Sequence, residues 1–237
     1  MIVTPGTSDG ARAARAATRT IPIVFSVGED PVALGLVASL ARPGGNATGI
    51  NFFSFEVNAK RLELMHELLP KATRYAVLVN PANAASTEAA SKALKEAANH
   101  LGLELHFFSA SSPAEIDEAF AAFARERVEA IFVAADALFA SRGVQFATLA
   151  VRERLPSSFN LREMVQAGML MSYGASIDDM YGQVGVYTGK ILNGTRPADL
   201  PVLQSIRFEL VINAQTARSL GIDIPPTLLA RADEVIE

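Results

Sequence analysis

Short apolar segments that favour strands alternate with amphipathic, helix-like segments along nearly the whole chain of 237 residues. This alternation is typical of βα units wound around a parallel sheet. Most of the apolar segments lack strict polar and apolar alternation, as expected of strands that helices cover on both faces. The pattern therefore predicts an α/β fold with interior parallel strands. The expected strands cover residues 21–27, 74–80, 103–109, 130–135 and 169–173.

Three segments carry clear helix signals. Ser112 has the features of an N-cap, because Pro occupies the first helical position after it and Glu115 completes a capping box. Ser176 begins a similar pattern. Residues 86–100 show helical spacing and end at Gly102, which can adopt the left-handed conformation of a C-terminal cap. We therefore expect helices after Ser112, after Ser176 and over residues 86–100.

Two turn-rich segments, residues 41–46 and 192–197, interrupt the alternation, and neither resembles a flexible linker. Residues 1–50 supply only two βα units, which are too few for a normal sheet. We therefore expect an incomplete N-terminal lobe. The predicted division has residues 1–55 as the remainder of an N-terminal lobe, 72–175 as a C-terminal lobe, and 176–237 as crossing segments and elements returning to the lobes.

Composition excludes several classes of protein. The chain has 21 basic and 25 acidic residues, so it lacks the positive surface that nucleic acid requires. It has no cysteine, which excludes disulfides, thiolate metal sites and cysteine nucleophiles. No apolar run approaches the roughly 20 residues that cross a bilayer. Residues 1–7 lack the pattern of a secretory signal, so the protein either is not exported or lacks its beginning.

The strand-to-helix loops are the candidate binding site. In open α/β sheets, ligands bind beyond the carboxyl ends of the strands, where helix N-termini present unpaired N–H groups. These loops contain many small polar residues, which could converge on one small polar ligand or could only cap their own helices. Asp30 and Asp136 could accept hydrogen bonds from the ammonium group of an amino acid, or could act only as favourable charges at helix N-termini. The candidate ligand-binding residues are Thr4, Gly6, Thr7, Gly28, Asp30, Asn80, Asn83, Ser86, Asp136 and Tyr173.

Aromatic residues near the same loops could enclose an apolar or aromatic part of a ligand. They are Phe52, Phe53, Phe55, Phe139 and Tyr173. The phenylalanines are more often core residues. Tyr173 is the stronger candidate, because it lies among small residues at a strand end and carries a polar hydroxyl group.

The sequence contains no convincing catalytic, metal or cofactor motif. The histidines His66, His100 and His106 lack the spacing of metal ligands. Residues 185–190 only resemble a phosphate-binding loop, and the dinucleotide and nucleophile-elbow motifs are missing. We therefore expect no catalytic residue, metal or cofactor. The glycines of the helix after Ser176 predict a close-packing stripe at Gly182, Gly185 and Gly189.

Several segments together resemble one known family. Residues 41–46, Ala-Arg-Pro-Gly-Gly-Asn, and residues 197–201, Pro-Ala-Asp-Leu-Pro, are its most specific elements. With residues 21–32 and 35–49 they are similar to the ABC-transporter substrate-binding family that includes the tryptophan- and tyrosine-type periplasmic binding proteins. The likeness continues through residues 76–81, 172–174, 190–194 and 208–236, and so covers essentially the whole chain.

This resemblance implies a type I periplasmic-binding fold, in which two doubly wound parallel-sheet lobes enclose a ligand cleft. It implies a solute-binding component of an ABC importer. The implied ligand is a small polar molecule, either an amino acid, which can be aromatic, or a related carboxylate, and the implied partner is an ABC permease. The implied location is periplasmic or lipid-anchored. By position, residues 4–7 and 28–31 form the first-lobe side of the cleft. Residues 80–86, Asp136 and Tyr173 form the second-lobe side.

The sequence departs from the family pattern at its start. Family members begin with an export or lipoprotein signal and further βα units before the strand that opens here at Ile2. We therefore expect a truncated first lobe whose exposed strand edge favours pairing with another copy, giving a homodimer. Two alternatives stay open: a cytoplasmic ligand-sensing module of the same fold, and an enzyme acting through Asp30 or Asp136.

Overall fold

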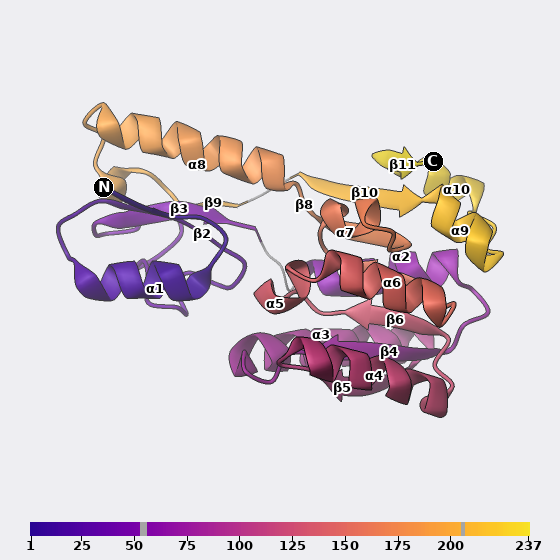
Figure 1. Cartoon of the computed structure of the whole chain (residues 1–237). Coiled ribbons are helices and arrows are strands. Elements are labelled where there is room, and N and C mark those ends of the chain that lie inside the picture. Colours follow the sequence, from indigo (N-terminus) through magenta and orange to yellow (C-terminus); the bar gives the residue numbers. More distant parts are fainter. Residues whose placement is uncertain (53–55, 205–206) are drawn as a thin grey trace. The chain divides into compact units, whose positions relative to one another are not determined.

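The computed structural model describes residues 1–52, 56–204 and 207–237 (Figure 1). The chain divides into two compact units, each built from two separate segments. Unit 1 comprises Met1–Ser54 and Ala175–Phe208, and unit 2 comprises Phe55–Gly174 and Glu209–Glu237. The chain therefore passes from one unit to the other three times.

Unit 1 contains a parallel sheet with the strand order β1-β2-β3-β9 among its described residues. The strands are β1 (Ile2–Thr4), β2 (Ile23–Val27), β3 (Ala47–Asn51) and β9 (Leu203–Gln204). Its helical elements are α1 (Ser8–Ala17), α8 (Ile177–Leu192) and the short 3-10 helix η1 (Pro197–Asp199). β2 and β3 are buried along their whole lengths, so they form the centre of the unit.

Helices cover both faces of this sheet (Figure 1). On one face, Ala11 of α1 packs in a cluster with Phe25. On the other face, Met180 of α8 packs in a second cluster with Val24 and Ile50. Because neighbouring residues of a strand point to opposite faces, the apolar residues of β2 serve both clusters.

Unit 2 contains a larger sheet with the strand order β11-β10-β8-β7-β6-β4-β5 among its described residues. Its strands are β4 (Arg74–Val79), β5 (Glu104–Ser109), β6 (Ala130–Val133), β7 (Ser157–Phe159), β8 (Met171–Ala175), β10 (Phe208–Asn213) and β11 (Glu234–Ile236). β5, β4, β6, β7 and β8 pair in parallel. β10 runs antiparallel to β8, since Asn213 N donates to the Leu170 carbonyl and Ser176 N donates to the Arg207 carbonyl.

The helices of unit 2 form a layer on each face of its sheet. One layer packs on a core that includes Met65, Leu94 and Phe132, and the other packs on a core that includes Phe120 and Phe146. The first layer consists of α2 (Glu56–Leu68), α3 (Ala84–Leu101), α9 (Ala214–Leu220) and α10 (Pro226–Leu229). The second consists of α4 (Pro113–Glu126), α5 (Ala137–Ala140), α6 (Gly143–Arg152) and α7 (Arg162–Gln166). The predicted α/β architecture with parallel strands is confirmed.

The five predicted strands are present, with ends that shift by one to two residues. The expected strands do not include β3, β7, β9, β10 or β11, and β3 and β7 show two different reasons for this. β3 contains Gly49, which resembles a turn residue but is required by packing, because a Cβ there would lie 1.9 Å from the Phe25 carbonyl oxygen. β7 has two serines among its three residues, and these give no strand signal although both are buried.

The predicted caps at Ser112 and Gly102 are confirmed, but the predicted capping box differs in one hydrogen-bond partner. Ser112 Oγ accepts a hydrogen bond of 3.3 Å from Glu115 N, and Gly102 ends α3 at a φ of 69°. The Glu115 carboxylate accepts from the backbone N–H and hydroxyl of Ser111, one residue before the position that a capping box requires. The glycine stripe on α8 is wrong as a packing surface, because among the described residues nothing beyond the local backbone lies within 4 Å of a Cβ built at Gly182, Gly185 or Gly189.

Candidate functional site

The carboxyl edge of the unit 2 sheet brings two predicted site residues together. Asn80 follows β4 and Asp136 follows the neighbouring strand β6. Asn80 Nδ2 donates a hydrogen bond of 3.0 Å to Asp136 Oδ1. The same oxygen accepts 2.9 Å from Leu138 N and so caps α5. Asp136 therefore is both a helix cap and part of a polar pair at the strand ends.

The N-terminus of α3 begins beside this pair. Asn80 Oδ1 accepts from Ala82 N at 3.0 Å, and its carbonyl accepts from Thr87 Oγ1 at 2.7 Å, which fixes the loop. Asn83 occupies the N-cap position without a side-chain capping bond, and the first turn contains no acidic residue. Ser86 is buried in that turn. A helix start without its own negative cap can receive an anion.

Tyr173 and one residue that the sequence analysis missed continue the same edge. Tyr173 lies in β8, is half-buried and packs against the core beneath α2 and α3. Asn160 follows β7, between β6 and β8, and its Oδ1 is buried with no hydrogen-bond partner among the described residues. The backbone of Asn160 lies close to the backbone of Gly174, and only glycine permits this, because a Cβ at residue 174 would lie 2.0 Å from the Asn160 carbonyl oxygen. A polar residue at a strand end was the available signal for Asn160.

In unit 1, the loop between β1 and α1 is held by the end of β2. Gly6 N donates 2.7 Å to Ser26 Oγ and 3.1 Å to the Ser26 carbonyl, and Gly6 has a φ of 79°. Thr7 is the N-cap of α1 without a side-chain capping bond. Thr4 Oγ1 is buried with no partner in the described part of the chain. Ser26 was missed, although a serine inside an apolar strand is a readable signal.

The loop after β2 contains the other predicted unit 1 residues. Gly28 is buried, whereas Asp30 is exposed. Asp30 Oδ1 accepts 2.8 Å from Val32 N, and residues 31–35 form turns. The interpretation of Asp30 as a charge at a helix N-terminus is therefore wrong, because no helix follows it. Its carboxylate stabilises a turn instead.

The aromatic candidates fall into core residues and one residue at the candidate site. Phe139 is fully buried with its ring centroid 5.7 Å from that of Phe146, so it is a core residue. Phe52 packs against the cluster beneath α8. Phe53 and Phe55 lie outside the described residues. Tyr173 is the aromatic candidate that the structure places at the carboxyl edge of unit 2.

A buried arginine on α2 lies under the same edge and was also missed. The Arg61 side chain has no exposed surface, and its guanidinium lies 3.8 Å above the centroid of the Phe132 ring. Nη2 donates 2.7 Å to the carbonyl of Val133, the last residue of β6. Burial lowers the pKa of Arg61 to about 9. The signal lies in the spacing, because Arg61 falls midway between the apolar Val57 and Met65 on one helix face.

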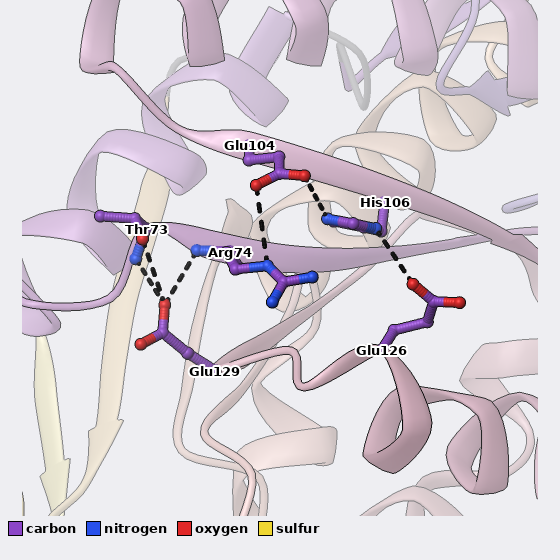
Figure 2. A network of polar contacts seen from close by, with 6 residues as sticks. All are labelled: Thr73, Arg74, Glu104, His106, Glu126 and Glu129. Atoms are coloured by element: carbon purple, nitrogen blue, oxygen red, sulfur yellow. Dashed lines mark hydrogen bonds and ion pairs between the residues drawn. The ribbon is translucent and has the colours of Figure 1, made fainter.

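A second polar network lies at the opposite edge of the unit 2 sheet (Figure 2). The Glu129 carboxylate accepts from Thr73 N at 2.8 Å and from Arg74 N at 3.0 Å, and these bonds lower the pKa of Glu129. His106 Nε2 lies 2.8 Å from Glu104 Oε1, without the alignment of a hydrogen bond. This network ties strand starts together and lies away from the carboxyl edge.

Searches of the described residues for other chemistry give negative results. No group of three or more His, Asp or Glu side chains there is arranged to hold a metal ion. No helix in the described ranges is both long enough and apolar enough to cross a membrane.

Two α/β units, each with a sheet covered on both faces, and a chain that crosses between them three times define a type I periplasmic-binding fold. The model of the family described as ABC transporter substrate binding protein matches residues 1–236. The chain belongs to this family, which confirms the resemblance read from its sequence. The family is one of solute-binding proteins.

The relatives agree with this assignment. A tyrosine-binding protein of Clostridioides difficile is 28% identical over 213 residues, which are 90% of this chain and 60% of that protein. The chain thus spans 60% of the length of this curated relative. An ABC domain from Streptococcus pneumoniae in complex with L-Trp has a TM-score of 0.85 at 28% identity, covering 100% of this chain and 78% of that one. A conserved domain protein from Vibrio cholerae has a TM-score of 0.85 at 32% identity, covering 98% and 77%.

Proposed function

We propose that this chain is the solute-binding component of an ABC importer. We propose that its ligand is an amino acid and that it prefers aromatic amino acids. The observation that carries the proposal is the N-terminus of α3, open to an anion, next to the Asn80–Asp136 pair. A free amino acid carries a carboxylate and an ammonium group a few ångströms apart. The edge of unit 2 offers a complementary group for each.

The carboxylate binds at the first turn of α3, where backbone N–H groups and the positive end of the helix dipole favour a negative charge. The ammonium binds at Asp136. Both hydrogen bonds accepted by the Asp136 side chain use Oδ1, so Asp136 Oδ2 has no hydrogen-bond partner among the described residues. The hydrogen bond from Asn80 orients the Asp136 carboxylate toward the ammonium group of the ligand.

Tyr173 supplies an aromatic surface with a polar tip for the ligand side chain. The names of two relatives support an aromatic ligand, since one is a tyrosine-binding protein and the other was solved with L-Trp. In unit 1, the exposed Gly6, Thr7 and Asp30 present polar groups beyond the strand ends and are the proposed ligand contacts of that unit.

The proposal includes the partners and location that accompany such a role. These are an ABC permease and a periplasmic or lipid-anchored position. It also includes a homodimer through β1, the edge strand of the unit 1 sheet, where Val3 is 39% exposed. Light scattering at tens of micromolar should give the mass of two chains. The mass of one chain would contradict the dimer and leave ligand binding untouched.

The chain contains no tryptophan, so the fluorescence of added L-tryptophan can be followed without tryptophan emission from the protein. We expect saturable binding of L-tryptophan, competition by L-tyrosine, and much weaker competition by tryptamine, which lacks the carboxylate. D-glucose is the control ligand. Binding of the sugar with no response to any L-amino acid would contradict the proposal.

A further inference from the structure

We propose that Arg61 provides the fixed positive charge by which unit 2 selects ligands bearing a carboxylate. This inference rests on the proposed function and assigns its specificity to a side chain outside the strand-end loops. Arg61 lies on α2, below the end of β6, and three residues after Val133 the chain reaches Asp136.

No group among the described residues neutralises the charge of Arg61. The guanidinium makes one hydrogen bond, to the Val133 carbonyl, and one contact with a ring face. Its Nε and Nη1 are buried and have no hydrogen-bond partner among the described residues, and no described carboxylate lies within ion-pair distance. Such a group attracts an anion strongly, because a low-dielectric environment screens its charge poorly.

Burying this charge is unfavourable for folding. The contact with Phe132 and the single bond to Val133 offset only part of the lost hydration, and an apolar side chain of similar size is commonly as stable or more stable at such a place. A side chain that is costly for stability and lies under a candidate site has the features of a functional group.

Asn58 strengthens this assignment because it lies one turn before Arg61, on the same face of α2. It too has no exposed surface, and both its Nδ2 and its Oδ1 are buried with no partner in the described part of the chain. Two adjacent buried polar side chains with unused hydrogen-bonding groups are unusual in a core. Arg61 contacts β6 through Phe132 and Val133, and Asn58 shares its helix face.

The position of Arg61 relative to Asp136 suits a zwitterion. A positive group beneath the end of β6 and a negative group just beyond it provide opposite charges for the two charged groups of an amino acid. The N-terminus of α3 adds its dipole at the same edge. Removal of the Arg61 charge should therefore weaken binding only for ligands that carry a carboxylate.

The test compares the dissociation constants of L-tryptophan and L-tryptophanamide, which keeps the ring and the ammonium group but has a neutral carboxamide. The wild-type protein should bind L-tryptophan at least about tenfold more tightly than the amide. In Arg61→Met this ratio should fall several-fold through weaker binding of L-tryptophan, and the part that remains is the contribution of the N-terminus of α3. Lys60→Met, which removes the neighbouring exposed charge paired with Glu63, should keep the wild-type ratio.

Thermal unfolding of the same variants separates a ligand role from a purely structural one. Arg61→Met should unfold at the wild-type temperature or above it. Arg61→Gln removes the charge but keeps an amide donor for the Val133 carbonyl. If Arg61→Met does not fold, Arg61→Gln should show the same fall in the preference for L-tryptophan over its amide. A wild-type ratio in the folded variant would overturn the role of Arg61 alone. Failure of the wild-type protein to bind L-tryptophan or L-tyrosine would overturn the proposed function as well.

Discussion

Asn80 Nδ2 and Asp136 Oδ1 lie 3.0 Å apart and form a hydrogen bond that joins the ends of two neighbouring strands. This bond and the one from Leu138 N orient the Asp136 carboxylate, the proposed acceptor for an ammonium group. Pre-orientation of this kind reduces the entropy lost on binding and so favours affinity.

Asp136→Asn should reduce ligand affinity and leave the fold nearly unchanged. Asparagine is a good N-cap and can keep the bond from Leu138 N, but it removes the charge that faces the ammonium. We expect at least about tenfold weaker binding of L-tryptophan in a fluorescence titration, equivalent to about 1.4 kcal/mol. Asp199→Asn, on an exposed residue of unit 1 paired with Arg196, is the matched control. Equal affinity in both variants would remove Asp136 from the site.

Two glycine substitutions should act in opposite directions. Gly174→Ala places a Cβ 2.0 Å from the Asn160 carbonyl oxygen and forces the backbone to move, so we expect a loss of about 3 kcal/mol or more in the free energy of unfolding. Gly185→Ala meets nothing within 4 Å on α8 and should stabilise the protein by up to about 1 kcal/mol. Urea denaturation measures both. A stable Gly174→Ala variant would show that β7 and β8 are less tightly packed than described.

Glu129 should contribute stability that depends on acid pH. The hydrogen bonds from Thr73 and Arg74 hold the pKa of Glu129 below its ordinary value of 4.5, so the folded state favours the ionised form. Its stabilisation is complete above the ordinary pKa and is lost as the pH falls through the lowered one. Glu129→Gln should therefore destabilise the protein at pH 7, by only a few tenths of a kcal/mol because solvent around this exposed carboxylate screens the interaction, and should have little effect near pH 2. A constant difference across this range would contradict the assignment.

Tyr75→Phe should stabilise the protein. The Tyr75 hydroxyl is buried with no partner among the described residues, so its removal relieves an unsatisfied polar group of about 1 kcal/mol. Burial, and then the charge of Glu129, raise the pKa of Tyr75 above its ordinary value of 10.0. The wild-type protein should thus lose stability as the pH rises above 10, and the variant should lose less. Calorimetry at neutral and alkaline pH gives both comparisons, and a lower melting temperature for the variant at neutral pH would contradict them.

The α/β fold was readable because it depends on local patterns. The apolar strand β2 and the end signals of α3 and α4 depend on neighbours in the sequence, and the structure confirms them. β3 was not readable, because Gly49 has its role only against the Phe25 carbonyl of another strand. Likewise, the exposure of the α8 glycines depends on what surrounds the helix and not on their spacing.

The candidate site was partly predictable for a related reason. Asn80 and Asp136 follow apolar strands, and the rule that ligands bind at carboxyl ends places them together. Arg61 and Asn58 were missed, because the spacing of Arg61 between apolar residues of one helix face hints at burial but does not show whether a long charged side chain still reaches solvent. Of the two interpretations of Asp30, the charge at a helix N-terminus was wrong, since the residues after it form turns.

Hydrogen exchange with and without saturating L-tryptophan tests most directly whether a ligand is held by the strand-end loops. We predict slower exchange in residues 4–8, 28–30, 80–88, 134–138 and 172–175, and unchanged exchange at the opposite edge of the unit 2 sheet around Glu129 and Glu104. Unchanged exchange throughout, or protection confined to that opposite edge, would contradict the account.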